Sequence, residues 1–191
     1  MPRLILASAS PRRRELLTGL GVRDLVIRPA KGEEHVPENA SAEEIVCSLA
    51  RQKAMEIAPT AEADDVVIAA DTVVFLDGLA LGKPHSEAHA REMLRRLSGR
   101  MHRVLTGVCV VRGEAVLCEA EDAKVFFREL TDREIDAYIA TNEPMDKAGA
   151  YGIQGKASLF VEHIEGDFFN IMGLPLCRLG NMLKKVGVEL L

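Results

Sequence analysis

Short runs of apolar residues alternate along this chain with segments in which apolar residues recur every three or four positions. The runs predict β-strands and the recurring segments predict helices. Residues 66–70 are apolar throughout, which predicts a strand covered on both faces. The predicted strands cover residues 3–7, 25–27, 66–70, 73–76, 79–81, 101–111, 115–129 and 157–164.

Cap and turn residues mark where the helices begin and end. Ser10 followed by Pro11 predicts a helix over 11–20 that stops at Gly21. A capping box at 41–44 predicts a second helix that runs to about Ile57, and a capping box at 131–134 predicts a short helix further along the chain. Two more helices are predicted from Ser86 to near Gly99 and from about Pro175. Hairpin turns at 77–78 and 112–113 and a glycine-rich loop at 149–155 complete the pattern. We predict a single α/β or α+β domain over residues 1–191, with a mixed sheet and a cleft.

The first predicted helix begins with an unusual charge. Arg12, Arg13 and Arg14 occupy its first turn, although the positive end of a helix dipole favours acidic residues. Backbone N–H groups, serine hydroxyls and guanidinium groups together suit a bound phosphate. The alternative is a solvated basic turn that pairs with nearby acids.

Asp71 directly follows the buried strand 66–70, and ligands of open α/β sheets gather at the carboxyl ends of strands. A carboxylate there can hold a metal or activate water, but it can also simply cap a turn.

Lys53 falls within the apolar stripe of its helix, so it must either extend toward solvent or meet an anion. Lys83 lies in a rigid Gly-Lys-Pro turn, where it is either an anion ligand or a surface lysine. Arg12, Arg13, Lys53 and Lys83 could together balance a polyphosphate, with Glu33 and Asp71 available for a divalent cation.

The composition and net charge of the chain argue against several kinds of binding partner. The chain has 191 residues, 48% of them hydrophobic, and a formal net charge of −5, which argues against binding to nucleic acid or to a membrane surface. The longest apolar runs are too short to span a bilayer, and we expect no signal peptide. The four cysteines have no close-pair spacing, so we expect them to be reduced packing residues of a cytoplasmic protein.

Five segments resemble the motif set of the Maf family, in the family's order and across essentially the whole chain. They are residues 8–13 (SASPRR), 70–74 (ADTVV), 82–84 (GKP), 151–155 (YGIQG) and 166–175 (GDFFNIMGLP). Maf proteins are nucleoside triphosphate pyrophosphatases, also known as septum-formation inhibitors. Gln154 makes the chain similar in particular to the branch that acts on dTTP and UTP.

The resemblance implies an elongated mixed sheet flanked by helices, with two lobes around a central cleft, as in inosine triphosphate pyrophosphatases. It implies hydrolysis between the α and β phosphates of a small-molecule nucleotide, a divalent cation such as magnesium or manganese, a possible homodimer and a cytoplasmic location. The alternatives are a purine-directed pyrophosphatase and a non-catalytic regulator of cell division.

The resemblance also assigns roles to individual residues. It makes Asp71 the general base, and it places the metal on Asp71 and Glu33, although Glu33 could itself be the base. The residues that it makes substrate-binding are Arg12, Thr72 and Gln154 for specificity, and Ser8, Arg13, Lys53 and Lys83 for the phosphates.

Overall fold

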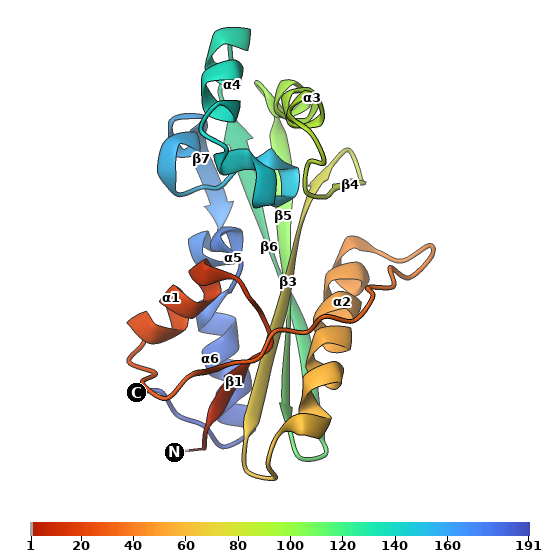
Figure 1. The fold of residues 1–191 in the computed structure, drawn as a ribbon, viewed down its shortest axis with the longest axis vertical. Coiled ribbons are helices and arrows are strands. Elements are labelled where there is room, and N and C mark those ends of the chain that lie inside the picture. Colours follow the sequence, from red (N-terminus) through yellow and green to blue (C-terminus); the bar gives the residue numbers. More distant parts are fainter. Residues whose placement is uncertain (1) are drawn as a thin grey trace. The chain divides into compact units, whose positions relative to one another are not determined.

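The computed structural model describes residues 2–191 and contains a seven-stranded mixed sheet (Figure 1). The strands follow the order β2-β1-β3-β5-β6-β7, and β4 pairs with β3 outside this path. β1 is parallel to β2 and β3, whereas β3–β4 and β6–β7 are antiparallel pairs. The strands are β1 (Leu4–Leu6), β2 (Val26–Ile27), β3 (Val66–Leu76), β4 (Leu79–Leu81), β5 (Met101–Arg112), β6 (Ala115–Phe127) and β7 (Val161–Gly166). The predicted mixed α/β class is therefore confirmed.

Most helix boundaries agree with the caps in the sequence. The α-helices are α1 (Pro11–Gly19), α2 (Ala42–Ile57), α3 (Glu87–Leu97), α4 (Asp132–Ile139), α5 (Phe168–Met172) and α6 (Leu176–Lys185). Both predicted capping boxes form, at the starts of α2 and α4, and the Ser86 hydroxyl accepts a hydrogen bond from the His89 N–H. Gly21 has a φ of +84°, as expected of a residue that ends a helix.

Three predicted boundaries are wrong. β3 does not end at Ala70 but continues through Asp71 to Leu76, because the β-branched residues 72–74 contain no strand breaker. Residues Gly155–Leu159 form a 3₁₀ turn, so β7 begins at Val161 rather than at 157. The strand predicted over 115–129 ends at Phe127, and α5 was not predicted, since its five residues are too short to show helical periodicity.

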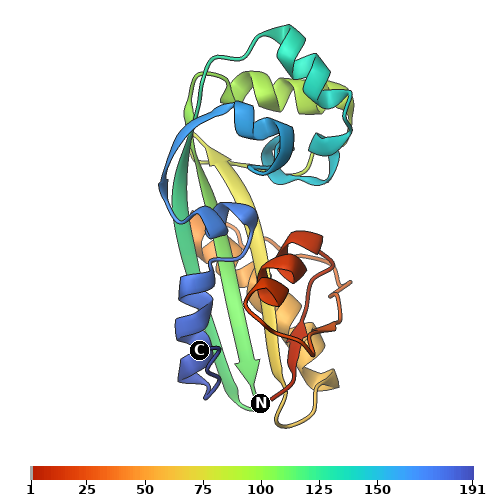
Figure 2. The same ribbon diagram turned by 90° about the vertical axis from the view of Figure 1, so that its left-hand side faces the viewer.

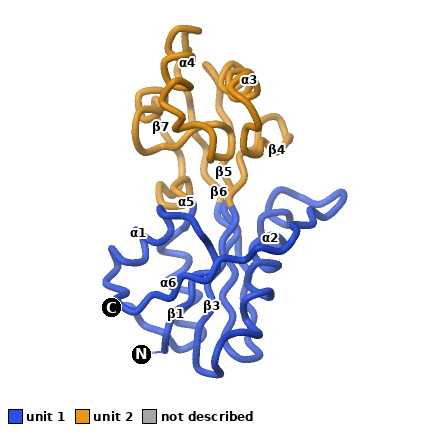
Figure 3. Tube along the Cα trace, viewed as in Figure 1, with its two compact units in different colours: residues 1–71, 106–121, 173–191 blue, residues 72–105, 122–172 orange. Residues whose placement is uncertain are grey.

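The chain divides into two compact units (Figure 3). Unit 1 comprises residues 1–71, 106–121 and 173–191, and unit 2 comprises residues 72–105 and 122–172. β3, β5 and β6 each contribute residues to both units. No helix within residues 2–191 is both long enough and apolar enough to cross a membrane.

In unit 1, helices cover both faces of the sheet (Figures 1 and 2). Leu17 of α1 and Leu179 of α6 pack on the face that carries Leu6, Ile68 and other residues of β1 and β3. Helix α2 packs on the opposite face, which carries the alternate residues of the same strands. This two-sided burial confirms the prediction for residues 66–70, all of which are at most 1% exposed.

Gly107 of β5 lets α2 approach the sheet unusually closely. A Cβ atom at this position would overlap the carbonyl group of Val46 on α2. The backbones of the helix and the strand therefore touch where any side chain would keep them apart.

Unit 2 has a core of its own. Helices α3 and α4 contact each other and enclose buried residues that include Leu94, Tyr138 and Phe160. Phe127 and Tyr151 join this core through edge-to-face ring contacts. The core supports the glycine-rich loop at 149–155, which carries Gln154.

Candidate active site

In unit 1, Arg13 is fixed against the loop that follows β1. Its Nη1 donates a hydrogen bond to the Ser8 Oγ at 3.0 Å, and its Nε donates to the Gly173 carbonyl at 2.8 Å. The Ser10 N–H also donates to the Ser8 Oγ, at 3.2 Å. Ser10 occupies the N-cap position as predicted, but its own side chain makes no capping hydrogen bond.

Burial and three charged residues act on the pKa of Arg13. Burial lowers the pKa of the Arg13 guanidinium, whereas the negative charges of Asp71 and Glu34 act in the opposite direction and Arg12 adds to the lowering. The cation is therefore partly desolvated yet close to acids, which suits a group that binds phosphate oxygens. Arg12 itself is half-buried.

Lys53 of α2 directly contacts Asp71, the candidate catalytic carboxylate. Its Nζ donates a hydrogen bond to the Asp71 Oδ1 and forms an ion pair with the Glu34 Oε1 at 3.0 Å. Asp71 is 9% exposed, and the side chain of Lys53 is 19% exposed. Of the two alternatives for Lys53, the structure supports an anionic partner, and that partner is a carboxylate of the protein itself.

The strand geometry explains this contact. Successive side chains of a strand point to opposite faces, so Asp71 lies on the same side as Val67 and Ala69, which α2 covers. Thr72, the next residue, lies on the other side. Asp71 also lies beyond Ile68, the last β3 residue paired with β1, so it does extend past the carboxyl end of that neighbouring strand.

Glu33, predicted as a metal ligand together with Asp71, has surroundings that differ from those of its neighbour Glu34. Within residues 2–191, Glu33 is exposed and forms no hydrogen bond or ion pair, whereas its neighbour Glu34 pairs with Lys53. No pattern in the sequence distinguishes two consecutive glutamates, so only the fold could show that Glu34 rather than Glu33 contacts Lys53. The same described part of the chain contains no group of three or more His, Cys, Asp or Glu residues suited to a metal. Asp71 and Glu34 nevertheless fit the one or two carboxylates that magnesium takes when phosphate oxygens complete its shell.

In unit 2, the structure brings together the segments that carry Thr72, Lys83 and Gln154. The Gly149 N–H donates to the Gly82 carbonyl at 3.0 Å, which joins the glycine-rich loop to the Gly-Lys-Pro turn. Gly149 has a φ of +69° and lies against Val74, two residues after Thr72, so closely that an added Cβ would be 2.9 Å from the Val74 side chain. Lys83 and Gln154 are both exposed.

His102, Tyr138 and Glu143, none of them a predicted site residue, anchor this loop through hydrogen bonds. The Tyr151 hydroxyl lies 2.7 Å from the His102 Nε2, and the Gly152 N–H donates to the Tyr138 hydroxyl at 3.3 Å. The Tyr138 hydroxyl in turn donates to the Glu143 Oε1 at 3.0 Å. Burial lowers the pKa of His102 to about 4, so the imidazole is neutral at pH 7. The chain has only two tyrosines; Tyr151 belongs to this loop and Tyr138 binds it. Their rarity is the one feature of the sequence that could have drawn attention to them.

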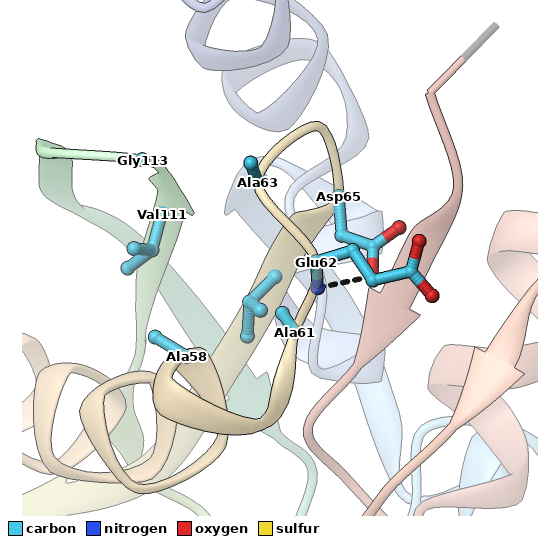
Figure 4. A pocket seen from close by; sticks show the side chains of 8 residues that line it. Ala58, Ala61, Glu62, Ala63, Asp65, Val111 and Gly113 are labelled. Carbon is cyan, nitrogen blue, oxygen red and sulfur yellow. Dashed lines mark hydrogen bonds between the residues drawn. The ribbon is translucent and has the colours of Figure 1, made fainter.

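Unit 1 also contains a small hollow (Figure 4). It has a volume of about 120 Å³ and is lined by Ala58, Ala61, Glu62, Ala63, Asp65, Val67, Val111 and Gly113. The Glu62 N–H donates to the Asp65 Oδ2 at its rim. It contains none of the candidate site residues and is smaller than the 300–1,000 Å³ typical of ligand pockets.

Comparison with known proteins agrees with the geometry. Residues 3–186 match the family model described as Maf-like protein. The chain is 48% identical to a dTTP/UTP pyrophosphatase of Caldicellulosiruptor bescii, covering 100% of this chain and 98% of the relative. It is 50% identical to a dTTP/UTP pyrophosphatase of Alkaliphilus oremlandii, covering 96% of each.

One solved structure supports the fold. A HAM1 protein from Coxiella burnetii aligns with a TM-score of 0.53 at 16% identity, covering 97% of this chain and 100% of that one. At this identity the likeness concerns the arrangement of the chain alone. The family match and the full-length identities go further, and they show that this chain belongs to the Maf-like protein family.

Proposed function

We propose that this protein hydrolyses dTTP and UTP to the nucleoside monophosphate and pyrophosphate. The observation that carries the proposal is the Asp71 carboxylate, held by Lys53 and electrostatically close to Arg13, in a chain about half identical to relatives named for this activity. Attack of water on a phosphoanhydride requires a base that accepts a proton from the water and cations that stabilise the charge on the phosphates. The Asp71 carboxylate and its neighbouring cations can fill these two roles. Nothing in the site favours a non-catalytic regulator over an enzyme.

In this mechanism, Asp71 orients a water molecule and accepts its proton. The water oxygen attacks the α-phosphorus, and the bond from that phosphorus to the bridging oxygen breaks, so that pyrophosphate leaves with the electron pair. Arg13 and Lys53 stabilise the negative charge that develops on the leaving group. Ser8 positions Arg13 through its hydroxyl, and Lys83 contributes a further cation.

A divalent cation fits the acidic residues of unit 1. Asp71 and Glu34 would hold magnesium or manganese, with the exposed Glu33 as a further candidate. When bound, the ion supplies positive charge that neutralises phosphate oxygens.

Residues of unit 2 recognise the base in this proposal. A glutamine amide offers one donor side and one acceptor side, which matches two adjacent groups on the edge of uracil or thymine. Gln154 is exposed at the end of a loop whose preceding residues 151–153 are buried, so its position is set by the fold rather than by its own contacts. Thr72 and Arg12 assist it. The homodimer and the cytoplasmic location stay predictions.

The direct test is pyrophosphate release from dTTP, UTP, CTP, GTP and ATP, with magnesium and with a chelator. We expect dTTP and UTP to have similar kcat/KM values and CTP to be at least about tenfold poorer, because a mismatched buried hydrogen-bonding group costs about 1–3 kcal/mol. Release from purine nucleotides alone would overturn the proposed substrate. An absence of release from every nucleotide would overturn the proposed enzyme class.

A further inference from the structure

Three of the four cysteines lie near one another in unit 1. Cys109 lies on β5 and Cys118 on β6, the two strands joined by the turn at 113–114. Counting outward from that turn places the two cysteines opposite each other, and their Sγ atoms are 2.6 Å apart. Cys47 of α2 is close enough to influence both thiols electrostatically.

The two opposed thiols are chemically unequal. Cys109 is completely buried, whereas Cys118 is half-buried. The contact with the Cys109 thiol lowers the pKa of Cys118, and the nearby Arg51 guanidinium acts in the same direction, whereas partial burial acts in the opposite one. Burial, in contrast, raises the pKa of Cys47. The thiolate is the reactive form of cysteine, so reaction with an oxidant should begin at Cys118.

We propose that Cys118 and Cys109 are a reversible oxidation site that forms a disulfide across the β5–β6 hairpin. The oxidant is a peroxide. The Cys118 thiolate attacks one peroxide oxygen, the O–O bond breaks, and Cys118 becomes a sulfenic acid while the second oxygen leaves as hydroxide. The Cys109 sulfur then attacks the Cys118 sulfur, and its proton and the sulfenic oxygen leave as water. Two thiols are oxidised, and one peroxide is reduced to water.

The hairpin already has the geometry that such a bond needs. Cα atoms of residues opposite each other on antiparallel strands are about 4.5–5.5 Å apart, within the range that disulfides span. No strand has to move to bring the sulfurs together. The redox pair is therefore built into the sheet itself.

The test uses the intact protein carrying Cys177→Ser, because Cys177 is the exposed cysteine and would link separate molecules. Treatment with hydrogen peroxide should reduce the mass by two hydrogens, and peptide mapping should find Cys109 joined to Cys118. A dithiol reductant should restore both thiols. Peroxide that adds oxygen atoms without forming the link, or that leaves both thiols unchanged, would overturn the proposal.

Single variants separate the roles of the thiols. In Cys109→Ala, a sulfenic acid should persist at Cys118 and be captured by a 1,3-diketone probe. Cys118→Ser should abolish the link, and Cys47→Ser, the matched control, should form it as fast as the parent. A link that forms from Cys47 to Cys118 instead would show that α2 supplies the second thiol, contrary to the proposal.

Discussion

The two groups of candidate residues are built in different ways. In unit 1, charged side chains contact one another, as Lys53 does with Asp71 and Glu34. In unit 2, Gln154 belongs to a loop that is fixed by backbone groups, two tyrosine hydroxyls and a neutral histidine. The difference suits the two tasks that we propose, which are to bind phosphates by charge and to distinguish a base by the placement of one amide.

The groups also differ in what binding requires of them. We expect a ligand in unit 1 to compete with contacts that exist without it, because the Lys53 ammonium already binds the Asp71 Oδ1. The hydrogen bonds that hold the unit 2 loop do not involve the Gln154 side chain, so we expect them to persist when a ligand binds. Substitutions in unit 1 should therefore change turnover, and substitutions in unit 2 should change selectivity or local stability.

The largest effect is expected from Asp71→Asn. Loss of the carboxylate's charge and basicity should reduce kcat by at least about a hundredfold, the usual cost of removing a general base. The measurement is pyrophosphate release from UTP, with Glu34→Gln as the comparison at the other partner of Lys53. If Asp71→Asn retains near-normal turnover in a folded protein, the base is elsewhere, and Glu33 and Glu34 are the next candidates.

Arg13→Ala should reduce kcat/KM by about 10- to 150-fold, because a charge-assisted contact contributes about 1.5–3 kcal/mol. Arg14, the exposed neighbour, provides the matched control Arg14→Ala, for which we expect little change. Arg13 also bonds Ser8 and Gly173, so a moderate fall in Tm should accompany the loss. Equal losses in the two variants would mean that only the general positive charge of this turn matters.

His102 should make unit 2 sensitive to acid. Its pKa is about 4 in the folded protein, below the usual 6.5, so the unfolded chain binds the proton more readily. This group's contribution to stability is therefore complete above pH 6.5 and falls as the pH drops toward 4. Between pH 7 and pH 5 the loss should be about 2 kcal/mol.

Denaturant unfolding at the two pH values, for the parent and for His102→Gln, isolates this contribution from those of other titrating groups. The parent should lose more stability than the variant on acidification. Identical losses would show that His102 is protonated as easily in the folded chain as in the unfolded one.

Gln154→Leu should reduce the preference for UTP over CTP about tenfold while leaving kcat for UTP within a few-fold, since the amide contributes to discrimination rather than to chemistry. The ratio of kcat/KM values for the two nucleotides measures it. The exposed neighbour Lys156 gives the control Lys156→Met. A collapse of kcat with unchanged selectivity would place Gln154 in the catalytic step.

The smallest effect is expected from Tyr151→Phe, which removes the hydroxyl beside His102. One buried hydrogen bond contributes about 1 kcal/mol, equivalent to about 2–4 °C in Tm for a chain of this size. Tyr138→Phe should cost more, because that hydroxyl serves both Gly152 and Glu143. The reverse order in thermal melts would contradict the loop anchoring described above.

Sequence reasoning recovered the parts of the fold that local patterns determine. Capping residues such as Ser41 and Thr131 fixed helix starts, and the apolar run 66–70 correctly predicted a strand buried on both faces. It failed where local patterns conflict. Residues 70–74 give conflicting signals: Asp71 is typical of a strand end or turn, whereas the β-branched residues 72–74 favour a continuing strand.

The site shows the same division. Lys53 was identifiable because a lysine in an apolar stripe needs an anion, and that anion was found. The role of Thr72 and Gln154 came only from family resemblance, since neither residue is unusual in its local sequence. The hydrogen bond between His102 and Tyr151 joins residues far apart in the chain, which no spacing rule anticipates.

The close approach of α2 at Gly107 has a mechanical consequence. The Val46 carbonyl of α2 occupies the space that a side chain at position 107 would fill. The neighbouring residues of β5 do have side chains, so α2 cannot slide along the strand without a clash. A slip of one helical turn would displace Lys53 by about 5.4 Å, which exceeds the reach of its contact with Asp71. Gly107 thus fixes the position of Lys53 relative to Asp71, although it has no side chain of its own. A design that places this charged pair in another protein would need a glycine at the equivalent position of the strand.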